Sequence, residues 1–396
     1  MRYIIFFFLL VIMIDPTNQI LGLKMLTFTI CIIICFFQRK HKYEKINYFF
    51  FMFITIYILY GILISYLNGK RLNWQFQSAY IQLICMSIFI FPLSRFSTDT
   101  ILKWNFKIGI ILAIIVIGCF IFYNSSEENG AALYYYVMKI QSVPTILISK
   151  RIFLGITFPA FFYKTAPFLL FPAIYQIKRI NSLKDILLLF LFLIPIFITG
   201  SRTPMLCGLC ILIYGILSSH RIGSLTKYLF SFILSLSFFI LVFMLLSETH
   251  EESIMVKGGN TRNYISDITS SFSNLFLGSG IGSSFFDIRG YWVQYSELTY
   301  LDVYRYWGII AGSVFIIFVF LPAILFLISS NEKMRGFALA YFLYMILAGT
   351  NPFLFSSTGW YCLIMGYLFL GRHIYHNMKY NDLSLSGNLQ RRKVSS

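Results

Sequence analysis

Long apolar runs separated by short polar connections set the pattern of this chain from its first residues to about residue 371. A run of about 20 mainly apolar residues can cross a bilayer as an α-helix, and roughly 17 to 25 residues are tolerated. The pattern therefore predicts an all-α, polytopic integral membrane helical bundle over residues 1–371. It places about twelve spans at approximately 3–14, 20–37, 46–66, 79–93, 101–123, 153–176, 185–199, 204–218, 228–247, 299–328, 336–349 and 358–371.

Composition supports the assignment to membrane proteins and indicates which binding partners to expect. The chain is 58% hydrophobic and 12% charged, with a mean hydropathy of +0.76, whereas ordinary soluble domains are about 25% charged. The net charge of +17 is spread between the apolar runs, so we expect a lipid bilayer and no nucleic acid as partner. Cys207 and Cys210 have redox or zinc spacing, but no second ligand pair lies nearby. We expect no metal and no cofactor.

The distribution of basic residues predicts the orientation in the membrane. When successive connections are assigned to alternate sides, 20 of the 32 Lys and Arg residues fall on one side, mostly in very short loops. Short cytoplasmic loops carry an excess of Lys and Arg. We therefore expect both termini in the cytoplasm, with a basic tail over 372–396. The longest connection, 248–298, is expected on the extracytoplasmic side.

This long polar interruption, 248–298, holds the strongest acid–base candidate. Ser296 can cap a helix that begins there, and Glu297 lies in its first turn, where a carboxylate is favoured by roughly 0.3–1 kcal/mol. An ordinary glutamate at a helix start would show the same pattern. Glu297 is the best-placed general base for a substrate hydroxyl. Asp287 and Asp302 are weaker alternatives.

The same region carries three cations, Arg262, Arg289 and Arg305. Arg262 lies near the start of the long connection, and Arg305 lies two turns into the helix that is expected to follow it. Cations that converge on one external cavity would suit a pyrophosphate-linked lipid. Separate solvated charges would indicate no particular ligand.

The run Gly278-Ser279-Gly280-Ile281-Gly282 looks like half of a dinucleotide-binding fingerprint. It lacks the preceding strand and the βαβ frame that such a site needs. We therefore reject the dinucleotide interpretation. A turn rich in glycine instead permits close approach of the backbone to a ligand or to a helix.

Arg202 lies in a tight outward turn, Thr199-Gly200-Ser201-Arg202-Thr203-Pro204, between two predicted spans. Proline is favoured in the first turn of a helix, and the free N–H groups of that turn suit a phosphate. The alternative is that Arg202 only reaches toward lipid headgroups. We interpret Arg202 as a candidate phosphate ligand.

Arg151 precedes a predicted span that is rich in proline, and Lys164 lies within that span. Its prolines, at 159, 167 and 172, predict a kinked or broken helix, which is tolerated where it lines a cavity. An unpaired charge at mid-membrane costs on the order of 3 kcal/mol. Lys164 is therefore expected to face protein or water, unless it extends to the membrane surface from a shifted helix.

Together these segments resemble the O-antigen polymerase family and its relatives, the O-antigen ligases. The resemblance covers most of the chain from Arg151 to the last span, and it rests on the order and spacing of short motifs on one side of the membrane. The motifs are Arg151 before the proline-rich span, Thr199-Gly200-Ser201-Arg202-Thr203, Arg262, Leu277-Gly278-Ser279-Gly280-Ile281-Gly282, Ser296-Glu297-Leu298-Thr299-Tyr300-Leu301, Gly308-Ile309-Ile310-Ala311-Gly312, and Asn351-Pro352 before Ser356-Ser357 and Gly359.

The resemblance implies a glycosyltransferase of the bacterial inner membrane that acts in lipopolysaccharide biosynthesis. It would move a growing chain from undecaprenyl pyrophosphate to the sugar of a second lipid-linked repeat unit. Arg151, Arg202 and Arg262 would bind the pyrophosphate. Lys164, Arg289 and Arg305 are further candidates for this role. A protein that regulates chain length is a candidate partner.

The resemblance also ranks the alternative functions of the protein. Ligase relatives typically carry a His-Asn pair where this chain has Ser296-Glu297, which favours the polymerase and leaves the identity of the base open. An O-antigen ligase, with a core glycolipid as acceptor, is the nearest alternative. A transporter or flippase for lipid-linked sugars is the alternative from a different class.

Overall fold

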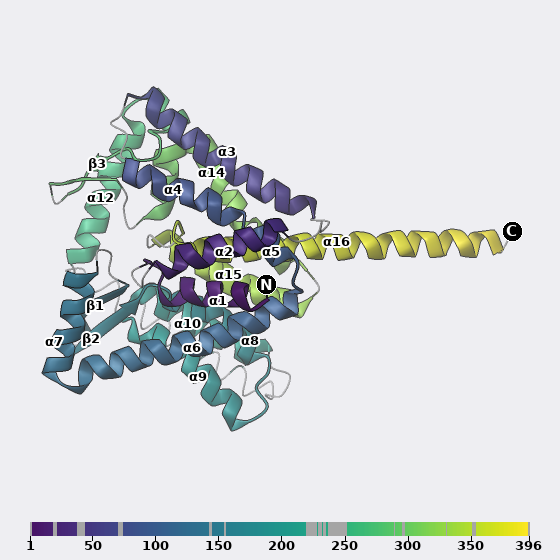
Figure 1. Ribbon diagram of the computed structural model, residues 1–396, viewed down its shortest axis with the longest axis horizontal. Coiled ribbons are helices and arrows are strands. Elements are labelled where there is room, and N and C mark those ends of the chain that lie inside the picture. The colour runs from purple at the N-terminus through teal and green to yellow at the C-terminus, as the bar shows by residue number, and fades with distance from the viewer. Residues whose placement is uncertain are drawn as a thin grey trace.

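The computed structural model describes most of the chain as a helical bundle (Figure 1). The described residues are 2–18, 22–37, 44–69, 74–141, 145–153, 156–218, 228, 232, 235–236, 252–288, 290–294, 298–329, 331–350 and 354–394.

Helices make up nearly all of the regular structure in these ranges. They are α1 (Arg2–Ile14), α2 (Leu23–Phe37), α3 (Lys45–Leu67), α4 (Trp74–Ser87), α5 (Ile90–Ser94), α6 (Thr98–Ser125), α7 (Glu127–Tyr135), α8 (Leu170–Ile177), α9 (Leu183–Ile198), α10 (Arg202–Ser218), α12 (Glu252–Thr269), α13 (Phe272–Leu277), α14 (Thr299–Leu327), α15 (Glu332–Thr350) and α16 (Ser357–Val394). A π-helix, η1 (Tyr136–Ile140), and a 3-10 helix, η2 (Ala166–Leu169), complete the helical elements.

Four helical segments are long and apolar enough to cross a membrane. They are Lys45–Leu67, Gln77–Ser94, Thr98–Ser125 and Thr299–Leu327. Several further helices, including α1, α10 and most of α15, are apolar but shorter. This architecture confirms the helical class and indicates a membrane protein. The count of twelve spans stays a prediction, and most of the span expected at 228–247 lies outside the described residues.

The prediction of a helix over 153–176 is wrong for its first half. In its place β1 (Ile146–Phe153) pairs antiparallel with β2 (Ile156–Tyr163), and η2 and α8 follow. Pro159 lies within β2, and Pro167 begins the turn that leads into α8. Because proline lacks an N–H and clashes with the preceding helical turn, this segment does not continue as one α-helix. The expected break is confirmed, and it is more extensive than a kink.

The long connection at 248–298 also holds more structure than a loop. It contains α12, α13 and a short hairpin of β3 (Phe285–Phe286) and β4 (Trp292–Val293). Asn260 on α12 accepts a hydrogen bond from the backbone N–H of Ile288 (3.0 Å), and the side chain of Asn263 donates to the carbonyl of Phe286 (2.9 Å). These bonds fix α12 against the hairpin.

The glycine run inserts between α3 and α14, as the close approach to a helix predicts. Gly278 and Gly280 have φ of +87° and +84°. A Cβ on Gly280 would lie 2.2 Å from the backbone nitrogen of Ser65 on α3. The N–H of Ser279 donates to the carbonyl of Arg305 (2.6 Å), and the N–H of Ile281 donates to the carbonyl of Gly61 (2.9 Å). The run therefore joins the two helices through its backbone.

Helix α16 passes through the centre of the bundle, and its C-terminal part projects on the side opposite to α7, α12 and the β1–β2 hairpin (Figure 1). Its buried part is held by polar bonds to distant helices. Tyr361 donates to Asn105 on α6 (2.6 Å), and Trp360 donates to Ser87 on α4 (2.8 Å). These bonds fix the start of α16 inside the bundle, where it borders a cavity.

Candidate functional site

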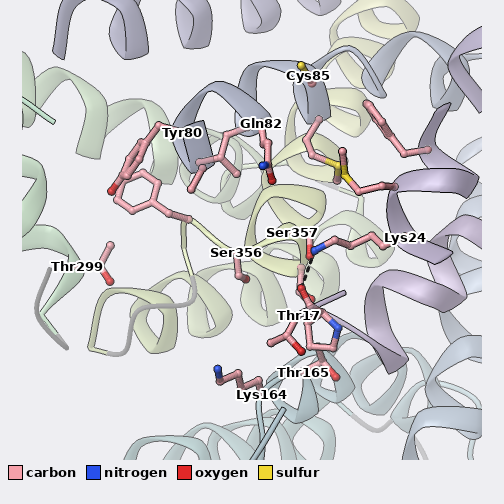
Figure 2. A pocket seen from close by; sticks show the side chains of 18 of the residues that line it. Thr17, Lys24, Tyr80, Gln82, Cys85, Lys164, Thr165, Thr299, Ser356 and Ser357 are labelled. Carbon is pink, nitrogen blue, oxygen red and sulfur yellow. Dashed lines mark hydrogen bonds between the residues drawn. The ribbon is translucent and has the colours of Figure 1, made fainter. Parts of the chain in front are cut away.

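A cavity of about 600 Å³ lies among the ends of several helices. Its walls come from the turn between α1 and α2, the first part of α2, α4, the turn after β2, the start of α14, and the start of α16. The polar lining residues are Thr17, Lys24, Thr29, Tyr80, Gln82, Lys164, Thr165, Thr299, Asp302, Ser356, Ser357 and Thr358, most of which Figure 2 labels. A mainly apolar cavity of this size that also presents several polar groups suits a small-molecule or headgroup ligand.

Lys164 provides a cation in the lining of the cavity. It follows β2 in the turn before η2, where its backbone N–H donates to the carbonyl of Thr145 (3.1 Å). The side chain is half-buried, and within the described part of the chain it forms no hydrogen bond or ion pair. Burial lowers the pKa of Lys164. A half-buried ammonium without a counter-charge is suited to an anionic ligand.

Lys24 supplies a second cation from the first turn of α2. Its Nζ donates to the carbonyl of Pro16 (2.8 Å), which holds the side chain in the wall of the cavity. One carbonyl uses only one of the three donors of an ammonium group. The buried carboxylate of Asp15 also acts on Lys24 electrostatically, so part of its charge is already compensated within the protein.

The start of α16 lies in the same wall and adds donors of its own. Ser356 accepts a hydrogen bond from the N–H of Gly359 (3.1 Å), as an N-terminal capping residue does. The hydroxyl of Ser357 is buried and has no hydrogen-bond partner in the described structure. A helix N-terminus carries a partial positive charge and free N–H groups. With Lys164 and Lys24, it adds positive charge to the lining of the cavity, which suits a phosphate.

Tyr80, Thr299 and Asp302 form another part of the lining, where Asp302 contributes a carboxylate that is paired with Arg305. Asp302 is 3% exposed. Its Oδ1 accepts hydrogen bonds from the hydroxyl of Tyr264 on α12 (2.7 Å) and from Nη2 of Arg305 (3.3 Å). Helix α12 is thereby bonded to the wall of the cavity.

Arg305 lies behind Asp302 and is fully buried. Its guanidinium carbon lies 5.2 Å from the ring centre of Tyr264, and 5.0 Å from the ring centres of Phe285 and Tyr306. Nη2 also donates to the carbonyl of Gln294. Aromatic faces attract a guanidinium group, so this aromatic enclosure and the ion pair together hold Arg305 at Asp302.

Of the residues predicted from sequence, Lys164 and the alternative acid Asp302 line the cavity, and Arg305 pairs with Asp302. Arg202 begins α10 and is half-buried, but it is not among the lining residues. Arg262 is exposed on α12. The backbone of Arg151 lies in β1 opposite Phe158. The described structure thus joins Lys164 and Arg305 to one site, and places Arg202 and Arg262 away from its lining.

Glu297 and Arg289 lie outside the described residues. Thr299, two residues after Glu297 in the chain, is the first residue of α14 and lines the cavity. The predicted helix start is wrong: Ser296 was expected as the cap with Glu297 in the first turn, whereas α14 begins at Thr299. Its N-cap residue is Leu298, which makes no side-chain capping bond.

Sequence reasoning missed three contributors to the site, namely Lys24, Ser357 and Tyr264. Lys24 had a usable signal, because it is a lysine near the outward end of a predicted span. Ser356-Ser357 was noted only as part of the resemblance. Nothing in the local sequence distinguishes Tyr264 from the other tyrosines, since its role depends on the packing of α12 against α14.

The comparisons with known proteins return no match: no protein-family model, curated protein or solved structure matches this chain. The functional argument therefore depends on the cavity and on the motifs of the chain itself.

Proposed function

We propose that this protein is a polysaccharide polymerase that joins oligosaccharide repeat units carried on undecaprenyl pyrophosphate. The observation that carries the proposal is a single cavity, in an apolar helical protein, whose lining includes Lys164, Lys24, the N-terminus of α16 and Asp302. The substrate class has matching parts: a pyrophosphate anion, a sugar that bears hydroxyl groups, and a long apolar chain for the bilayer.

The chemistry needs little beyond what such a cavity offers. Undecaprenyl pyrophosphate is a good leaving group, so the enzyme has to hold it and stabilise the negative charge that grows as the sugar–phosphate bond breaks. Lys164 and Lys24 are placed for this, and electrostatic stabilisation of this kind is often the largest catalytic contribution. Arg151, Arg202 and Arg262 stay candidates for further contacts along the pyrophosphate or its sugar chain. Glu297 stays the proposed base for the acceptor hydroxyl.

The proposal places the cavity on the extracytoplasmic side. Short basic connections predict cytoplasmic termini. The C-terminal part of α16 projects on the side opposite to α12 and the β1–β2 hairpin (Figure 1), and α12 contacts the cavity wall through Tyr264. A bacterial cytoplasmic membrane with the repeat units displayed outside fits this arrangement.

Deletion of the gene in its host, followed by electrophoresis of the surface polysaccharide, tests the proposal. Loss of a polymerase leaves single repeat units attached to the outer-membrane lipid. Loss of a ligase leaves none attached, and this second outcome would replace the polymerase by the ligase. A plasmid copy of the wild type restores the long chains, and Lys164→Ala does not. Lys103→Ala on the exposed face of α6 is the matched control, which restores them.

A further inference from the structure

A second pocket lies at the end of the bundle from which α16 projects, and we propose that it binds the headgroup of an anionic phospholipid. Its volume is about 280 Å³. Its walls come from the start of α6, the end of α8 and the start of α15. It shares no described residue with the cavity of the candidate site. The inference is therefore independent of the proposed function.

Three helix ends meet at this pocket. Leu102 lies one turn into α6, Gly336 lies one turn into α15, and Lys178 is the C-terminal cap residue of α8. Arg372, where α16 leaves the bundle, donates to the hydroxyl of Thr98 at the start of α6 (3.2 Å). The pocket thus lies on the side opposite to α12 (Figure 1). The distribution of Lys and Arg predicts that this side is cytoplasmic.

The neighbouring helix α9 indicates the depth of the pocket in the membrane. Leu183, Leu187 and Phe190 on α9 are exposed, and their spacing places them on one face of the helix. A large exposed apolar face is typical of a surface that contacts lipid. Arg179 lies four residues before the first of these residues. The pocket is therefore close to the level of the phosphate headgroups.

Arg179 supplies hydrogen-bond donors to the pocket. Its guanidinium carbon lies 4.0 Å from the ring centre of Tyr175 on α8. Stacking on a ring uses none of the five N–H donors of a guanidinium group. Among the described residues, the Arg179 side chain has no hydrogen-bond or ion-pair partner. The tyrosine ring thus holds the guanidinium in place, and its paired donors match two oxygens of a phosphate.

Lys178 adds a second cation to the same pocket. Its Nζ lies 5.8 Å from the ring centre of Tyr214 on α10, and a Cβ on Gly336 would lie 3.3 Å from that Nζ. Because Gly336 has no side chain, the end of Lys178 packs directly against α15. A lysine that only extends to the membrane surface needs no such place between helices.

The remaining lining suits the part of a lipid next to its phosphate. Phe171, Ile174 and Phe337 give this lining an apolar surface. The volume is slightly below the usual lower limit of about 300 Å³ for small-molecule pockets, so the pocket holds a headgroup and not a whole lipid. Basic pockets between membrane helices on the cytoplasmic side are typical binding sites for anionic headgroups.

The test measures lipid binding to the purified full-length protein by native mass spectrometry in detergent. The probes are phosphatidylglycerol and phosphatidylcholine with the same acyl chains. We expect phosphatidylglycerol to bind about fivefold more tightly or better, since choline brings a further positive charge close to two cations. The double variant Lys178→Gln with Arg179→Gln should weaken phosphatidylglycerol binding about tenfold or more.

The matched control is the double variant Lys103→Gln with Lys184→Gln. It removes two exposed charges at the starts of α6 and α9, and neither residue lines the pocket. It should change phosphatidylglycerol binding less than about twofold, because exposed charges contribute little. Equal losses in the two double variants would overturn the pocket, since they would indicate attraction to surface charge in general. Equal binding of the two lipids to the wild type would overturn the anionic headgroup.

Two further arms test the pocket and the source of the phosphate. Gly336→Leu keeps both cations but fills the space beside Lys178, and should weaken phosphatidylglycerol binding about fivefold or more. Unchanged binding in this variant, with a Tm near that of the wild type, would overturn the pocket. Inorganic phosphate contains the same anion without the lipid. Phosphate that binds at Lys178 and Arg179 and that phosphatidylglycerol does not displace would overturn the lipid assignment.

Discussion

Gly280→Ala is expected to destabilise the protein by separating α3 from α14. Gly280 has φ of +84°, a region that costs a residue with a Cβ about 1–3 kcal/mol. The new methyl group would also meet the nitrogen and Cα of Ser65 at 2.2 and 2.4 Å. These are backbone atoms of a helix, so no side-chain rotation can relieve the overlap.

The second part of the destabilisation comes from the backbone hydrogen bonds that the glycine run makes. The N–H of Gly280 donates to the carbonyl of Tyr306 (3.1 Å), and its neighbours Ser279 and Ile281 donate to Arg305 and Gly61. A shift that relieves the overlap lengthens or breaks some of these bonds, at about 1 kcal/mol each. With the backbone cost, the expected loss in the free energy of unfolding is roughly 3–5 kcal/mol.

Gly290→Ala is the matched control. Gly290 has φ of +85°, and among the described residues a Cβ there would meet no atom within 4 Å. This variant is expected to lose only the backbone cost of about 1–3 kcal/mol. Thermal unfolding of the purified protein in detergent, followed by tryptophan fluorescence, compares the two. Trp307 is a buried reporter, because it donates to the carbonyl of Tyr57 on α3 (2.8 Å) and lies beside the run. Equal shifts in Tm for the two variants would refute the steric argument.

Three further predictions concern the cavity and the central helix. Lys164→Ala raises the KM for the lipid-linked repeat unit about tenfold or more, and Lys164→Arg largely restores it, as measured by polymer formation in proteoliposomes. Equal activity of the alanine variant would contradict the phosphate assignment. Burial lowers the pKa of Lys164, so the affinity of the wild type for this unit should fall as the pH rises through this lowered pKa, below the usual range of lysine. In Lys164→Arg, whose guanidinium stays charged, that alkaline loss should disappear from the pH profile. Asn105→Ala leaves the buried hydroxyl of Tyr361 without its partner at 2.6 Å and should cost about 1–3 kcal/mol in thermal unfolding; a loss below half of that would indicate that the α6–α16 bond contributes little.

The helical class and the approximate bounds of several long helices could be predicted from the sequence, because a bilayer imposes a minimum apolar length. Helix α14 was expected over 299–328 and is found at Thr299–Leu327. The same rule failed at 153–165, where a hairpin replaces a helix. Apolar composition measures burial, and a buried strand is as apolar as a buried helix. The prolines indicated a break but not the hairpin that replaces the helix.

The candidate site was only partly predictable for a related reason. Lys164 could be recognised because a charge within an apolar run is costly and so must be accommodated. The pairing of Tyr264 with Asp302 joins residues 38 positions apart in the sequence, and no local pattern records it. Gly308 shows the same limit: its φ of +72° interrupts α14 and makes room for the glycine run, although the sequence there reads as one continuous apolar helix. Long-range packing decides these features.

The most direct test of the central claim is reconstitution of the purified chain with undecaprenyl-pyrophosphate-linked repeat units bearing a labelled sugar. The account predicts a ladder of longer lipid-linked chains with release of undecaprenyl pyrophosphate, and loss of this ladder in Lys164→Ala but not in Lys103→Ala. Label that crosses the bilayer without any new glycosidic bond would contradict the account and indicate a transporter.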